Sequence, residues 1–140
     1  MIVVYDSPKK IYDFVKSILE ITLKELKLQD YKILYHTLDR DQEKEIGIYL
    51  YENGDDYKSI DKNIWSNIKV HVQVNAENGE KGFFDALNLL TEFTHNIEKS
   101  KPNNLELQDV SVVGPRAVCF GTNEHNIKMC KSDIALKFIS

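Results

Sequence analysis

Cysteine and histidine are the side chains in this sequence most able to act as nucleophile, base or metal ligand. The chain contains two cysteines, Cys119 and Cys130, and four histidines. Nucleophilic catalysis needs a thiol beside a base, and the sequence leaves open a Cys–His pair made with His71 or His125. The alternative, which we favour, is that Cys119 is a small buried thiol within the apolar segment 117–120.

Spacings typical of metal, calcium and phosphate sites are incomplete in this sequence. The histidines are scattered, and neither His-Glu-x-x-His nor Cys-x-x-Cys occurs. The acidic run 39–44 resembles the start of a calcium loop, but Lys44 replaces the required glycine and Leu50 the closing acid. Gly79 and Gly82 lie at the start of a predicted helix without the Lys-Ser or Lys-Thr pair of a phosphate loop. We therefore predict a protein that is not an enzyme, with no catalytic, metal or cofactor-binding residues.

The composition predicts a single globular domain over residues 1–140. Apolar residues make up 42% of the chain and charged residues 29%, as in folded domains rather than disordered or membrane-embedded chains. The 18 basic and 22 acidic residues give a net charge of −4, so the basic surface of a duplex-DNA-binding protein is missing. No apolar run approaches the ~20 residues of a membrane span, and no signal-peptide pattern opens the chain. We expect an intracellularly made protein with no membrane partner.

Two long amphipathic helices are predicted. The first begins at Ser7 and Pro8, which favour helix initiation. Over about twenty residues it carries apolar side chains at spacings of three and four, namely Ile11, Phe14, Val15, Ile18, Leu19, Leu23 and Leu26. The second is predicted from about Glu80 to Ser100, with Pro102 just beyond it and an apolar face made by Phe83, Leu87, Leu90, Phe93 and Ile97.

Extended segments are predicted between and after these helices. They cover 31–36, 46–51, 68–75, 105–113 and 127–139, with a further short strand near Ala117. The clearest period of two lies at 68–75, where four aliphatic residues alternate with four polar ones. The element order α-β-β-β-α-β-β predicts an α+β domain. In it, both helices pack on one face of a mostly antiparallel sheet of four or five strands.

Large aromatic and polar side chains fall on the other face of the predicted sheet and in the loop between its second and third strands. Such side chains outside a core are enriched in protein interfaces. The alternative is a second buried layer made by that loop folding back, and the sequence does not decide between the two. The subunit-interface candidates are Tyr49, Tyr51, Trp65, His71, Gln73 and, as a salt-bridge donor between subunits, Arg116.

The element order is accompanied by short recognisable strings. They are IYDFV at 11–15, IGIYLY at 46–51 followed by ENG, VHVQV at 70–74, GPR at 114–116 and FGTNE at 120–124. With these features, which span nearly the whole chain, the sequence resembles the minor-capsid and tail-terminator proteins of tailed bacteriophages. It departs from that pattern at 38–45 and 55–56, where prolines and glycines of the family are replaced.

The resemblance implies a structural virion protein at the head–tail junction, assembled in the bacterial host cytoplasm. Such proteins form a ring, commonly of six subunits, which caps the head-proximal end of the tail tube and stops its polymerisation. The implied partners are further copies of the chain, the tail tube protein and the head connector or stopper, and DNA passes through the ring without specific binding. The alternatives are a stopper or adaptor ring, a minor capsid component and, more remotely, a small Cys/His enzyme or ligand-binding module.

Overall fold

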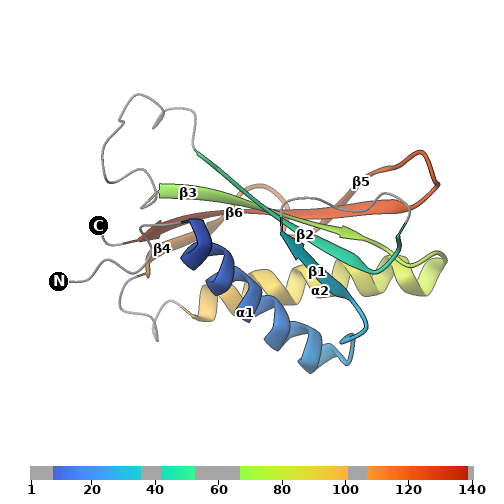
Figure 1. The fold of residues 1–140 in the computed structure, drawn as a ribbon, viewed down its shortest axis with the longest axis horizontal. Helices are drawn as coiled ribbons and strands as arrows, with labels where there is room; N and C mark the ends of the chain where they lie inside the picture. The colour runs from blue at the N-terminus through green and yellow to red at the C-terminus, as the bar shows by residue number, and fades with distance from the viewer. Residues whose placement is uncertain (1–7, 36–41, 53–66, 101–106, 139–140) are drawn as a thin grey trace.

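The order of helices and strands agrees with the predicted α+β class. The structure, a computed structural model, describes residues 8–35, 42–52, 67–100 and 107–138 (Figure 1). Its elements are α1 (Pro8–Leu26), β1 (Lys32–Tyr35), β2 (Glu45–Glu52), β3 (Asn67–Asn75), α2 (Glu80–Lys99), β4 (Leu107–Val112), β5 (Val118–Thr122) and β6 (Lys128–Phe138). The prediction of two helices and one mostly antiparallel sheet in a single α+β domain is confirmed. Neither of the two described helices is long and apolar enough to cross a membrane.

The strands form one sheet of six in the order β1-β2-β3-β6-β4, with β5 also paired to β6. Only β1 and β2 run parallel, and every other pairing is antiparallel. The sixth strand is β5, the short segment near Ala117 that the sequence left as an addition to the predicted four or five. Strands distant in sequence thus become neighbours, because the C-terminal strand β6 lies beside β3 in the middle of the sheet.

The long strand β6 pairs with three other strands, β3, β4 and β5. One side of β6 pairs with β3 along nearly its full length, from Met129 to Lys137. Its other side pairs first with β5, over residues 128–131, and then with β4, over residues 134–138. The chain therefore leaves the sheet between β4 and β5, at Gly114, where a φ of 79° favours glycine.

Both helices cover the same face of the sheet, as Figure 1 shows. The predicted alternation in β3 is confirmed for its four aliphatic side chains, which are buried, and for Lys69, His71 and Gln73, which are only partly covered. The fourth polar residue, Asn75, departs from it, because it is buried and its side-chain amide donates to the carbonyl of Gln42 at 3.1 Å. The core consists of aliphatic and aromatic side chains from both layers, including Ile11, Val15, Leu19, Ile46, Ile48, Val70, Val72, Leu89, Leu90, Phe93, Ile97, Ile134 and Leu136. Fully burying one such side chain contributes about 1.5–3 kcal/mol, so this core is the main source of stability.

A specific backbone turn ends α1. Lys27 takes a positive φ of 59°, and the amide of Leu28 donates a hydrogen bond to the carbonyl of Leu23 at 2.8 Å. This six-to-one bond after a left-handed residue satisfies a carbonyl that the helix end would leave unpaired. The turn directs the chain from α1 into β1.

The two helices also meet through a polar contact. The Asn96 side chain amide donates hydrogen bonds to Thr22 Oγ1 and to Glu25 Oε1, each at 2.9 Å. Thr22 is fully buried, and its hydroxyl donates in turn to the carbonyl of Ile18 at 2.8 Å. Because a buried hydroxyl without partners destabilises a fold, these bonds keep α1 and α2 in one relative position.

Candidate functional site

The strand register brings side chains from three strands into one row on the face of the sheet that points away from the helices. Tyr49 of β2 is paired with His71 of β3, and His71 is paired with Asp133 of β6. The next row holds Gln73 beside Lys131. Directly opposite residues of neighbouring strands share a face, so these side chains are in reach of one another. We call the surface formed by Tyr49, His71, Gln73, Phe120, Lys131 and Asp133 the open face.

Ion pairs and hydrogen bonds centred on Asp133 hold the open face together. His71 Nδ1 lies 2.8 Å from Asp133 Oδ1, and Lys131 Nζ lies 3.0 Å from Asp133 Oδ2. His71 Nε2 lies 3.5 Å from Gln73 Oε1, at the limit of hydrogen-bond distance. The side chains of Asp133 and His71 are only 16% and 22% exposed. One carboxylate therefore orients a cation and an imidazole from two strands.

The environment of Asp133 favours its ionised form. Burial by itself would raise the pKa of this carboxyl, but the hydrogen bonds from His71 and Lys131 outweigh burial and lower the pKa below its usual value. An ionised carboxylate can only accept hydrogen bonds. His71 Nδ1 therefore carries a hydrogen atom and donates a hydrogen bond to Asp133 Oδ1.

Aromatic contacts extend the open face on both sides of His71. The ring centroids of Tyr49 and His71 are 5.5 Å apart with an interplanar angle of 60°, and those of His71 and Phe120 are 6.3 Å apart at 68°. Lys131 Nζ lies 5.9 Å from the Phe120 centroid. Edge-to-face rings and a nearby cation are favourable geometries. Phe120 is nevertheless 45% exposed, so a large apolar surface stays in contact with solvent.

The structure brings together three of the predicted candidates, Tyr49, His71 and Gln73. The backbone of Tyr51 follows in β2, opposite Lys69. Its side chain, like the whole of Trp65, lies outside the described residues. The alternative of a second buried layer made by the loop that contains Trp65 lies outside them as well.

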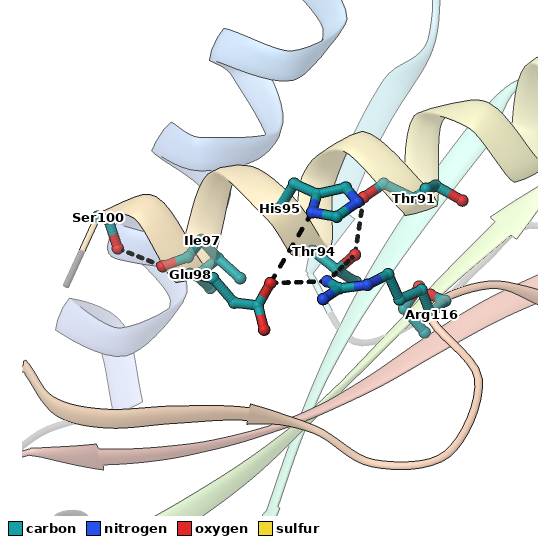
Figure 2. A network of polar contacts seen from close by, with 8 residues as sticks. Thr91, Thr94, His95, Ile97, Glu98, Ser100 and Arg116 are labelled. Carbon is teal, nitrogen blue, oxygen red and sulfur yellow. Dashed lines mark hydrogen bonds and ion pairs between the residues drawn. The ribbon is translucent and has the colours of Figure 1, made fainter.

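Arg116 lies elsewhere, on the helix side of the sheet (Figure 2). Its guanidinium nitrogen Nη1 donates to Glu98 Oε1 at 2.7 Å and to Thr94 Oγ1 at 3.2 Å, both on α2. Its backbone carbonyl accepts a hydrogen bond from the Ser132 hydroxyl of β6. The side chain therefore ties the loop between β4 and β5 to α2 within the chain. The predicted salt bridge from Arg116 to another subunit stays a prediction. An acidic residue of that subunit would have to compete with Glu98 for the guanidinium of Arg116.

Three members of the open face, Phe120, Lys131 and Asp133, were not among the predicted candidates. A usable signal exists in both segments, because each of the three residues is adjacent in sequence to one that packs toward the helices, namely Cys119, Cys130 or Ile134. A β-bulge between Cys119 and Gly121 then aligns Phe120 beside β6. What the sequence lacks is the pairing partner, since nothing local indicates that residue 133 lies opposite residue 71.

The open face holds part of a catalytic arrangement. A histidine whose Nδ1 is held by a carboxylate is the base of many hydrolases, but it acts on a nucleophile beside Nε2. Here the described neighbour of Nε2 is Gln73, which is not a nucleophile. Cys130 pairs with Val74 and is buried toward the helices, so it lies on the opposite face of the sheet from His71. The alternative of a thiol paired with His71 is therefore not formed by the described residues.

No group of three or more histidine, cysteine or acidic side chains positioned to hold a metal ion occurs within residues 8–35, 42–52, 67–100 and 107–138. The open face presents one imidazole, one ammonium, one carboxylate and two aromatic rings to its surroundings. The sequence matches no protein-family model and no curated protein.

Proposed function

We propose that this protein is a ring-forming structural component of the tail-terminator type found in tailed bacteriophages. In this role it caps the head-proximal end of the tail tube, stops tube polymerisation and docks the head connector. The observation that carries the proposal is the open face, where ordered aromatic and charged side chains occupy a sheet face that neither described helix covers. The whole-chain resemblance in element order and short strings supplies the class of assembly.

The composition of the open face supports a protein contact. Interfaces are enriched in tyrosine and phenylalanine at their centres, and Tyr49 and Phe120 flank the ordered His71. The side chain of His71 is already oriented by Asp133, so a partner would meet a preorganised surface. Covering the exposed part of Phe120 with an apolar surface would provide the hydrophobic contribution.

Ring formation imposes a geometric condition on this contact. In a closed ring each subunit uses two different surfaces, and the rotation between neighbours must close on itself, since otherwise a filament results. The open face is one of these surfaces in our proposal. The net charge of −4 suits a ring through which DNA passes, because acidic walls repel phosphates instead of binding them.

The first test is the mass of the native particle by light scattering, followed by negative-stain imaging with purified tail tubes. The proposal predicts either a ring of about six subunits in solution or a cap at one end of the tube. A protein that stays monomeric at high concentration and also ignores the tubes contradicts it. Binding to the head connector but not to the tube would indicate the alternative role of a stopper or adaptor.

A matched pair of variants tests the surface itself. Phe120→Glu and Phe84→Glu change the same residue type at similar exposure, 45% and 50%, but Phe84 belongs to α2 rather than to the open face. We expect Phe120→Glu to abolish ring or cap formation because it replaces an apolar contact by a charge that the interface would have to desolvate, and Phe84→Glu to leave it intact. Rings that form normally with Phe120→Glu, or loss with both variants, would contradict the assignment. Circular dichroism of both proteins checks that the fold is retained.

A further inference from the structure

The antiparallel pairing of β5 with β6 places the two cysteines of the chain directly opposite each other. Cys119 of β5 is the register partner of Cys130 of β6. Both are free thiols, with Cys130 buried and Cys119 partly exposed. Directly opposed residues share one face of a sheet, and Cys119 packs against the core to which Cys130 belongs. The two sulfur atoms therefore lie on the helix side, opposite to the open face.

The hydrogen-bond pattern shows which kind of pair this is. The carbonyl of Lys128 accepts from the amide of Ala76, which follows β3, so the polar backbone groups of Lys128 point toward β3. Backbone direction alternates along a strand, and Cys130, two residues later, points its polar groups the same way. Cys119 and Cys130 are therefore a non-hydrogen-bonded pair of the β5–β6 ladder.

Pairs of this kind suit a covalent link. Their Cα atoms lie about 4.5 Å apart, closer than in hydrogen-bonded pairs. A disulfide joins Cα atoms at about 4.4–6.8 Å, so the backbone is already within range, at its shorter end. A rotation of the two side chains about their Cα–Cβ bonds is then the main movement that is needed.

We propose that Cys119 and Cys130 form a reversible cross-strand disulfide in the folded protein on reaction with a low-molecular-weight disulfide such as oxidised glutathione. The thiolate of Cys119, the more accessible thiol, attacks one sulfur of the reagent, whose S–S bond breaks and releases one thiol. The thiolate of Cys130 then attacks Cys119 Sγ in the mixed disulfide and expels the second thiol. Two protein thiols are oxidised, the reagent is reduced to two thiols, and the two protons from the cysteines end on them.

The second step is the slow one. Burial, with a further contribution from neighbouring Cys119, raises the pKa of Cys130 to about 12, and Lys128 offsets only part of this effect. Near neutral pH only a small fraction of Cys130 is therefore thiolate, and that fraction rises about tenfold per pH unit. We expect the mixed disulfide at Cys119 to accumulate first and to resolve faster as the pH increases.

Intact-mass spectrometry of native protein incubated with excess oxidised glutathione, then acid-quenched and alkylated, tests the proposal. The expected product has lost two hydrogens, carries no alkyl group and returns to the starting mass with a reductant. Cys130→Ala should instead stop at one glutathione on Cys119, and Cys119→Ser should react far more slowly at its remaining thiol. Persistent glutathionylation of wild-type Cys119 without an internal bond, or disulfide-linked dimers, would overturn the proposal.

A second measurement uses the wild-type protein alone and does not depend on the folding of any variant. The rate at which the mixed disulfide resolves should rise from pH 7 to pH 9, because burial raises the pKa of Cys130 above the ordinary range and only its thiolate attacks. A mixed disulfide that resolves only in denaturant, and not in the folded protein, would refute a native-state link.

Discussion

Replacing Asp133 by asparagine tests whether the open face is ordered by its charges. The substitution keeps the shape of the side chain but removes the charge that accepts from His71 at 2.8 Å and from Lys131 at 3.0 Å. Hydrogen bonds to charged groups contribute about 1.5–3 kcal/mol each when buried. The amide retains one acceptor oxygen, and Lys131 is one-third exposed, so we expect Asp133→Asn to lower the free energy of unfolding by about 1–2 kcal/mol.

Urea unfolding followed by far-ultraviolet circular dichroism measures this loss. With a slope of about 2 kcal/mol per molar urea, the midpoint should fall by about 0.5–1 M at pH 7. Asp13→Asn is the control, because Asp13 pairs with Lys9 at 2.8 Å on the exposed face of α1, where both side chains are 47% exposed or more. Exposed pairs contribute about 0–1 kcal/mol, so this control should shift the midpoint less.

The pH dependence of the Asp133→Asn effect has a defined sign. The pKa of Asp133 is lower in the folded protein than its ordinary value of about 3.9, so the ionised form favours folding. The stabilisation by the ionised carboxylate is fully present when the pH lies above the ordinary pKa. It is lost as the pH falls through the lower pKa that Asp133 has in the folded protein. The stability difference between wild type and Asp133→Asn should therefore shrink as the pH falls below about 3.9. Equal midpoints at pH 7, or a difference that does not shrink as the pH falls below about 3.9, would refute the reasoning.

Three further substitutions test the fold that supports the open face, each by the urea midpoint of the purified variant. Phe93→Ala empties the largest fully buried site in the core and should cost about 3–5 kcal/mol, and a smaller loss would mean that the core collapses around the cavity. Gly82→Ala should destabilise by about 1–3 kcal/mol despite the better helix propensity of alanine, because its Cβ would lie 2.1 Å from the carbonyl oxygen of Glu77; a stabilised variant contradicts this close approach. Arg116→Ala should cost about 0.5–1 kcal/mol by removing the partly exposed ion pair with Glu98, and an equal effect in a Glu98→Gln background would show that the pair is not the cause.

Local periodicity in the sequence determined the helices and the direction of most side chains. The stripe that begins at Ile11 and Val15 predicts α1, and the alternation around Val72 predicts which face of β3 is buried. Both patterns are local, because a helix or strand repeats its orientation every few residues whatever lies beyond it. The alternation in β2 and β3 correctly predicted that Tyr49, His71 and Gln73 point away from the core, so half of the open face was predictable.

Pairing between distant segments was decided only by the tertiary structure. The sequence contains no local signal that β6 lies beside β3, so neither the Asp133 partner of His71 nor the contact of Phe120 could be predicted. Arg116 illustrates the same point, because its partner Glu98 is reached only after the chain leaves the sheet between β4 and β5. Register is selected by the total burial across all strands at once, whereas periodicity is a property of each segment alone.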